Sequence, residues 1–421
     1  MRFLRNLHRD AKLLMVSRGI RAFAFSYLNV VFAIYLDRLG YSTVTIGVIF
    51  TVAYLSSAIL TALWGYLSDR VGRQKILMLL AVLTILSNII LIYFTGLIFI
   101  LAAVIIANVG AGGTGGGGSG GGPFNPVEEA LLAEKCQPEN RNQIFAVNSC
   151  AGSIMGSLGA LASGVPQYLQ ETWGWSAVSS YKPLFVLTIV FSVALFFVYG
   201  AITEQHQPRR VQKKISKATG VFVTKLSMLA VVDNFGAGMA GALVPYWFYL
   251  RFGVELKSLG VIFFASYLLA ALSFLSAPLI ARHLGIVKTM AFSHGLASIL
   301  YLTVPLAPAL SVAAALIVIR SFFAYMDNPL RASFTMAMVR SSERGSAAGV
   351  TSLARIVPFG ISPTISTYLM QTVSLTLPLF IGGGLQLLND VAFFLMFRHV
   401  RPPEELAANE PKRSSVEELS G

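Results

Sequence analysis

The sequence predicts an all-α membrane protein whose twelve transmembrane helices form two similar six-helix bundles. Of the 421 residues, 55% are hydrophobic and only 12% are charged, whereas about 25% of the residues in a soluble domain are charged. Apolar runs long enough to cross a bilayer recur along the whole chain. The two halves of the sequence also repeat similar motifs at a fixed spacing.

Twelve apolar runs can each span the hydrocarbon layer as a helix. They cover 13–36, 44–64, 76–95, 97–122, 143–165 and 183–203 in the first half, and 221–249, 257–281, 286–306, 308–330, 346–370 and 374–397 in the second. The basic N-terminus leads directly into the first run without a small-residue cleavage site. We therefore expect a first transmembrane helix there, and no signal peptide.

The positions of lysine and arginine predict the orientation of the chain. An even number of spans puts both termini on one side, and 23 of the 32 basic residues lie in segments on that side, against four in the opposite loops. Basic loops are retained in the cytoplasm, so we expect both termini to be cytoplasmic in a multi-pass protein of the plasma membrane. This placement explains the net charge of +13 without a nucleic-acid partner.

A polar, basic segment at 204–220 divides the chain into halves that repeat one another. Gly40 and Gly72 recur as Gly253 and Gly285, both at an offset of 213. We expect four parts: an N-terminal six-helix bundle at 1–203, a cytoplasmic linker at 204–220, a C-terminal six-helix bundle at 221–398 and a cytoplasmic tail at 399–421.

The segment from Gly65 to Lys75 reads Gly-Tyr-Leu-Ser-Asp-Arg-Val-Gly-Arg-Gln-Lys and lies between the second and third runs. We expect a short loop in which Gly65 permits close approach of a neighbouring helix and Gly72 adopts a positive φ. Asp69 is suited to the N-terminus of a helix or to an arginine. The basic residues that hold this loop in the cytoplasm are Arg70, Arg73 and Lys75.

The order G-x-L-x-D-R-x-G-R-x-K resembles the signature loop of the major facilitator superfamily, and the twelve runs and the repeat extend that resemblance over nearly the whole chain. The resemblance implies alternating access, in which two bundles rock about a midplane site. It also implies that helices 1, 4, 7 and 10 line the central cavity. Many relatives carry an arginine in the fourth helix, but the fourth run here has none.

Two glycine-rich segments predict unusual backbone packing. Gly110–Gly122, in the fourth run, contains ten glycines, which favours either a helix packed unusually close to a neighbour or an unwound hinge. In the fifth run, small residues share one helical face, which indicates close helix packing. These residues are Ser149, Gly152, Gly156, Gly159 and Ser163.

Charged and amide side chains inside the runs are the candidates for substrate or ion binding, because a bilayer tolerates such groups only when they are paired or hydrated. The candidates are Arg21, Asn29, Asp233, Asn234, Arg320 and Arg355. Two hypotheses remain open for Asp233: it binds substrate or a proton near the midplane, or it forms a static ion pair with Arg320.

Other charges near the predicted surface have simpler expected roles. Arg18 is close enough to the cytoplasmic side to extend its guanidinium into the interface. Glu128 and Glu129, which follow the fourth run, either pair with Arg331 or Arg344 or are solvated.

No enzyme signature is present, because the sequence has no HExxH motif and the glycine tract lacks the lysine of a phosphate-binding loop. We therefore expect a monomeric permease without cofactor or metal, driven by an ion or substrate gradient. The expected function is efflux of small amphipathic organic molecules by proton antiport. The alternatives are uptake or exchange of small organic anions, suggested by the buried arginines, and a non-transporting receptor or scaffold, for which the polar segments are short.

Overall fold

The computed structural model describes residues 8–107, 122–136, 141–203, 216–241, 243–339 and 343–398, and every regular element among them is helical. The first half comprises α2 (Arg9–Arg38), α3 (Thr43–Val71), α4 (Arg73–Tyr93), α5 (Leu97–Ala107), α6 (Phe124–Glu134), α7 (Arg141–Leu161), α8 (Val165–Trp173) and α9 (Lys182–Gly200). The second half comprises α10 (Lys217–Ala240), α11 (Val244–Phe252), α12 (Leu256–Leu284), α13 (Ile286–Thr303), α14 (Leu310–Met338), α15 (Arg344–Thr372) and α16 (Leu377–Phe397).

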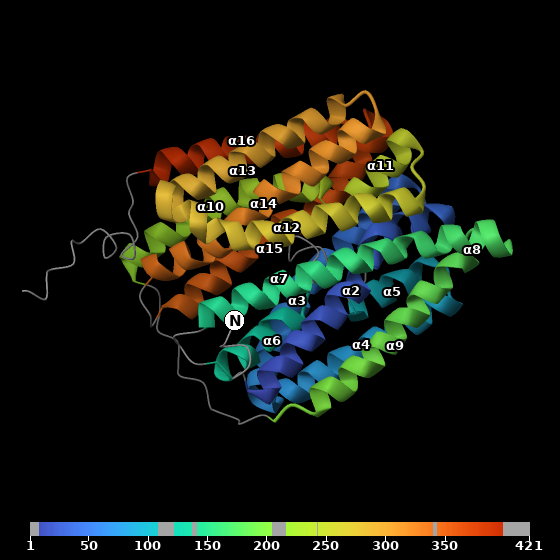
Figure 1. Ribbon diagram of the computed structural model, residues 1–421, viewed down its shortest axis with the longest axis horizontal. Helices are drawn as coiled ribbons and strands as arrows, with labels where there is room; N and C mark the ends of the chain where they lie inside the picture. The colour runs from blue at the N-terminus through green and yellow to red at the C-terminus, as the bar shows by residue number, and fades with distance from the viewer. Residues whose placement is uncertain are drawn as a thin grey trace, which may run out of the picture.

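The long helices run side by side between two ends of the molecule (Figure 1). We call the end at which α2 begins and α16 ends the terminal end, and the opposite end the distal end. The predicted division at 204–220 stays a prediction, since residues 204–215 and 399–421 lie outside the described chain and α10 already begins at Lys217.

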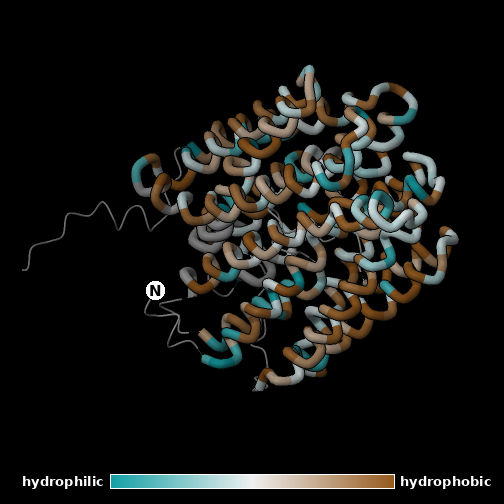
Figure 2. The backbone as a smooth tube through the Cα atoms, turned by 45° about the vertical axis from the view of Figure 1, so that its right-hand side comes forward, coloured by the Kyte–Doolittle hydropathy of each residue, from teal (hydrophilic) through white to brown (hydrophobic). Residues whose placement is uncertain are grey.

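The surface of the bundle suits a membrane. Within the described residues, ten helices are long and apolar enough to cross a bilayer. α5 is a shorter apolar helix, and α15 has 29 residues with Pro358 and Pro363 inside it. Large apolar side chains are exposed along the helices, for example Ile98 at 80% and Phe197 at 68%, and hydrophilic residues gather mostly at helix ends (Figure 2). These features confirm the predicted all-α, twelve-span fold class.

The predicted loop at 65–75 is wrong in its extent, because a single residue separates the two helices. α3 continues to Val71, Gly72 turns with φ +110°, and α4 begins at Arg73. The Gly72 N–H donates to Ser68 O, and the Gly72 carbonyl accepts from Ile76 N, so helical bonding continues on both sides. In the second half Gly285 separates α12 from α13 in the same way, with φ +85°. The repeat therefore reflects a real structural equivalence.

Small residues bring some helices into backbone contact, as the fifth run predicts. A Cβ on Gly159 of α7 would lie 2.3 Å from the Phe23 carbonyl oxygen of α2. Gly260 of α12 meets Ala160 O and Ser163 Oγ in the same manner. The expected close approach of a neighbouring helix at Gly65 is wrong, since no atom of another element lies within 4 Å of the position that a Cβ on Gly65 would take. The glycine tract lies outside the described residues up to residue 121, so both of its expected conformations remain predictions.

Among the described residues, the buried apolar cluster that combines both halves lies toward the distal end. Toward the terminal end the described residues form separate clusters, one built from α2, α4, α6, α7 and α9 and another from α10, α12, α13, α14 and α16. α3 packs on α15 and α7 packs on α12 across this distal junction (Figure 1). The halves are thus joined at one end and packed independently at the other.

Polar contacts reinforce the distal junction. The Tyr246 hydroxyl of α11 donates to Asp37 Oδ1 of α2 at 2.8 Å. Val44 N of α3 donates to Gln371 Oε1 of α15 at 3.1 Å. Lys257 at the start of α12 pairs with Glu171 of α8.

We predict that Gly159→Ala lowers the thermal stability of the detergent-solubilised protein, because the new methyl group would force α2 and α7 apart. Such overpacking costs about 1–3 kcal/mol. The matched control is Gly384→Ala in α16, where no atom lies within 4 Å of the added carbon. Melting curves that fall equally for both variants, or for neither, would contradict the close α2–α7 contact.

Candidate functional site

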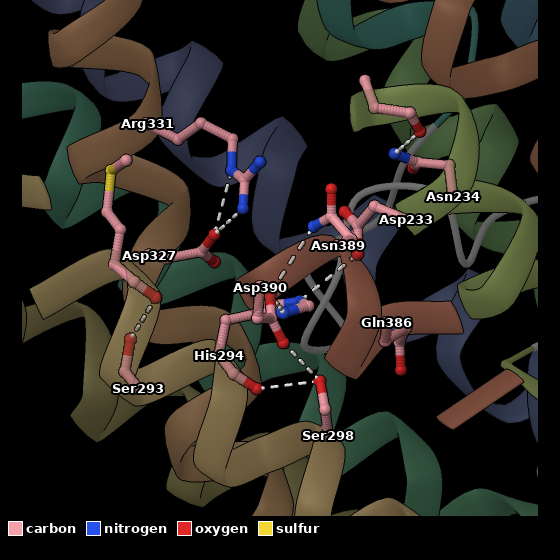
Figure 3. A network of polar contacts seen from close by, with 12 residues as sticks. Asp233, Asn234, Ser293, His294, Ser298, Asp327, Arg331, Gln386, Asn389 and Asp390 are labelled. Atoms are coloured by element: carbon pink, nitrogen blue, oxygen red, sulfur yellow. Dashed lines mark hydrogen bonds and ion pairs between the residues drawn. The ribbon is translucent and has the colours of Figure 1, made fainter. Parts of the chain in front are cut away.

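A histidine in the second half lies between two carboxylates (Figure 3). The Nδ1 atom of His294, on α13, is 2.7 Å from Asp390 Oδ1 on α16. Its Nε2 atom is 3.8 Å from Asp233 Oδ1 on α10. Ser298, one turn along α13, donates to the second oxygen of Asp390 at 2.6 Å. All four side chains are buried, so three helices converge on one imidazole.

A second charged pair lies beside this histidine, on α14. Arg331 donates from Nε and Nη2 to Asp327 Oδ2 at 2.9 and 2.7 Å, one helical turn away, and both residues are buried. Arg355 on α15 interacts electrostatically with Asp233 and Asp327. We call Asp233, His294, Asp327, Arg331 and Asp390 the charged cluster.

Arg320 occupies a different level of the same helices. Its guanidinium carbon lies 4.3 Å from the centre of the Tyr301 ring on α13. Its Nη2 atom approaches Gln386 Oε1 on α16 at 3.4 Å. The hypothesis of a static pair between Asp233 and Arg320 is therefore wrong, since Asp233 faces His294 and Arg320 faces an amide.

The first half contains a buried ion pair of its own. Arg21 on α2 is completely buried and pairs with Glu128 on α6. Glu128 also accepts from Ser17 on α2 and Tyr199 on α9. Phe124 covers the Arg21 guanidinium, with the ring centre 5.2 Å away. The network joins three helices of one half.

Two expectations for this region are corrected by the network. Arg18 does not extend to the surface: it is 4% exposed and donates to Asn125 at the start of α6. Glu128 pairs with Arg21 of its own half and not with Arg331, which is bound to Asp327. The short helix α6 supplies a buried carboxylate close to α2, and this carboxylate is the counter-charge of Arg21.

The two asparagine candidates, Asn29 and Asn234, have no ion-pair or side-chain partner given by the described contacts. Asn234 donates to Ala230 O, one turn back on α10, and Asn29 is half-buried on α2. Sequence reasoning missed His294 and Asp327 as site residues. A titratable histidine inside the run at 286–306 and the four-residue spacing of Asp327 and Arg331 were the available signals.

The signature segment connects α3, α4 and α6. Arg73 approaches Asp69 at 3.3 Å and also pairs with Glu134 of α6. Arg70 lies 4.4 Å over the Tyr66 ring, and Lys75 is exposed. The anticipated arginine contact of Asp69 is thus present, and Arg73 provides it.

We predict that Glu128→Gln strongly destabilises the protein, because Arg21 would stay buried without its counter-charge. Breaking a buried ion pair typically costs about 3–5 kcal/mol. Glu171→Gln is the control, since Glu171 and Lys257 are about half exposed and such surface pairs contribute about 0–1 kcal/mol. Thermal unfolding in detergent measures both variants, and equal losses would argue against a structural role for Glu128.

We predict that Asp69→Asn leaves folding intact but slows transport about fivefold, the effect of roughly 1 kcal/mol on a conformational equilibrium. The substitution weakens the contact with Arg73 at the terminal end. Counterflow rates and thiol accessibility from each side of a vesicle measure the effect. A variant with wild-type rates and accessibility would exclude a conformational role for Asp69.

The sequence of this chain is similar to those of known membrane proteins. The sequence profile of the Major Facilitator Superfamily matches residues 14–357. The chain is 22% identical over 427 residues to the uncharacterized membrane protein YJR124C of Saccharomyces cerevisiae, covering 92% of this chain and 94% of that protein. It is 28% identical over 200 residues to the multidrug resistance protein MdtG of Dickeya zeae, covering 46% of this chain and 44% of that one.

A solved structure has the same fold. The human organic anion transporter MFSD10 (TETRAN) aligns with a TM-score of 0.67 and 14% identity, covering 91% of this chain and 99% of that chain. The profile match spans well over half of the chain, and the described helices form the expected multi-pass bundle. The chain therefore belongs to the major facilitator superfamily and is a transporter of small molecules, not an enzyme.

Proposed function

We propose that this transporter exports small amphipathic organic molecules across the plasma membrane in exchange for protons, and that His294, Asp390 and Asp233 carry the proton. The observation that supports this most directly is the single imidazole between two carboxylates of different helices. The nearer carboxylate, Asp390, pairs with the imidazole, and Asp233, 3.8 Å away on another helix, offers the proton an alternative partner.

The groups of the cluster can exchange a proton. An imidazole can both take up and release a proton, and carboxylates on two other helices lie close enough to share that proton. The carboxylates that interact with the imidazole are Asp233 on α10, Asp327 on α14 and Asp390 on α16. Arg331 on α14 and Arg355 on α15 interact in turn with Asp233 and Asp327. A change of separation between α10, α13 and α16 would alter which carboxylate stabilises the proton.

The arrangement of the halves supports a site that opens to one side at a time. The halves share a core at the distal end and have separate cores toward the terminal end. If the termini are cytoplasmic, as the basic residues predict, this is a state closed to the outside. Rocking of the halves would open the distal junction and change the side of the membrane from which the cluster can be reached.

The remaining predicted site residues divide into two roles in this proposal. Arg21 supports the first half through Glu128, whereas Arg320, Arg355, Asn29 and Asn234 are proposed substrate contacts. Similarity over about half the chain to a protein named for multidrug resistance supports efflux of amphipathic molecules. We propose that the monomer is the transporting unit.

We predict that His294→Gln and Asp233→Asn abolish accumulation driven by a pH gradient but retain substrate exchange. Purified protein in proteoliposomes is assayed by counterflow with cationic, neutral and anionic amphipathic solutes, with and without the gradient. His283→Gln is the matched control, because His283 is exposed on α12. Asp233→Asn is included because it should disturb folding less than His294→Gln. The contact of Asp233 with His294 is the longer of the two carboxylate contacts.

Three outcomes are informative. Loss of pH-driven accumulation with exchange retained supports proton coupling by the cluster. Wild-type accumulation in both variants would exclude it. Transport of none of the solutes by the wild-type protein would contradict the proposed substrate class.

A further inference from the structure

Arg320 is half-buried and differs from the neighbouring cations inside the second half, because no carboxylate among the described residues pairs with it. Arg331 binds Asp327, and His294 binds Asp390. Arg355 has Asp233 and Asp327 in electrostatic range. Arg320 has the amide oxygen of Gln386 at 3.4 Å and the face of Tyr301. A guanidinium ten residues inside an apolar helix is costly unless an anion accompanies it.

One donor on the edge of this guanidinium has no hydrogen-bond partner in the described structure. The ring of Tyr301 covers the face, and a cation–π contact leaves the N–H groups free in the guanidinium plane. The Arg320 Nε atom is buried and has no hydrogen-bond partner in the described structure. The Nη2–Gln386 bond is long enough to be exchanged for a better acceptor. Together Nε and Nη2 form the two-donor edge that binds a carboxylate in a bidentate manner.

Two neutral groups complete the surroundings. The Tyr301 hydroxyl is buried, with 1% of the residue exposed, and likewise has no hydrogen-bond partner in the described chain. Gln386 is 2% exposed and brings an amide whose nitrogen can donate once the oxygen is displaced. Unsatisfied buried donors of this kind are costly, and an oxyanion would satisfy them.

The position links this group to the proposed proton site. Gln386 lies one helical turn from Asp390 on α16, and Tyr301 lies about one turn from Ser298 on α13. A ligand at Arg320 would therefore contact the same helices that hold the charged cluster. Movement of α13 or α16 on binding would reach the imidazole directly.

We propose that Arg320, Tyr301 and Gln386 form a subsite for a carboxylate group of the transported amphipathic molecule. This inference rests on the proposed transport function and specifies its substrate class: amphipathic organic acids. The guanidinium binds the carboxylate, and the apolar remainder of the molecule lies along the helices.

The test measures binding and transport separately. Purified wild-type protein and Arg320→Gln, Arg320→Lys and Arg251→Gln variants are titrated with matched pairs of a carboxylate and its amide, such as indole-3-acetate with indole-3-acetamide and decanoate with decanamide. Thermal-shift and fluorescence titrations give the affinities. Arg251 is an exposed residue at the end of α11 and serves as the control.

The wild-type protein and Arg251→Gln should bind the carboxylate at least about tenfold more tightly than the amide, the effect of one charge-assisted hydrogen bond. Arg320→Gln should lose this preference while keeping its affinity for the amide. Arg320→Lys should retain part of the preference, since a lysine keeps the charge but not the bidentate edge.

An undiminished carboxylate preference in Arg320→Gln would overturn the subsite, and so would a wild-type protein that binds no carboxylate of the panel. Proteoliposomes that transport cationic or neutral solutes but no carboxylate would overturn the subsite and leave the transport proposal standing. Proteoliposomes in which no solute moves would instead contradict the proposed function.

Discussion

Charges inside a bilayer must be compensated within the protein, and this constraint governs the interior of both halves. In the first half Glu128 compensates Arg21, and hydroxyls of Ser17 and Tyr199 occupy the same carboxylate. In the second half the compensation is shared more loosely, with one histidine between two aspartates. The first arrangement favours a fixed structure, whereas the second is the one proposed to let a proton change partner.

The repeat relates these two networks with their charges reversed. Glu128 and Arg331 correspond at the offset of 203 that relates Asn125 to Asn328, and Arg21 corresponds to Asn234, next to Asp233, at the offset of 213. In the first half Arg21 on α2 faces Glu128 on α6. In the second half Asp233 on α10 lies in the electrostatic range of Arg331 on α14. Equivalent positions of the two halves thus interact electrostatically, but with opposite polarity.

The number of spans, the family and the glycine turns could be predicted, because hydropathy and glycine spacing are local properties of the chain. The partners of buried charges could not. Arg18 and Glu128 were assigned to solvent or to the other half, because sequence spacing does not reveal that α6 returns to α2. His294 was not predicted as a site residue, because its role depends on carboxylates of two other helices, and the sequence does not show that these lie beside it.

The one-residue connection at Gly72 has a mechanical consequence. Because only one residue separates α3 from α4, the ends of the two helices cannot move far apart. We therefore expect a tilt of α3 to move the start of α4 as well. Arg73 also connects this corner to α6 through Glu134. The terminal ends of α3, α4 and α6 are therefore linked, and α3 extends from them to the distal junction with α15.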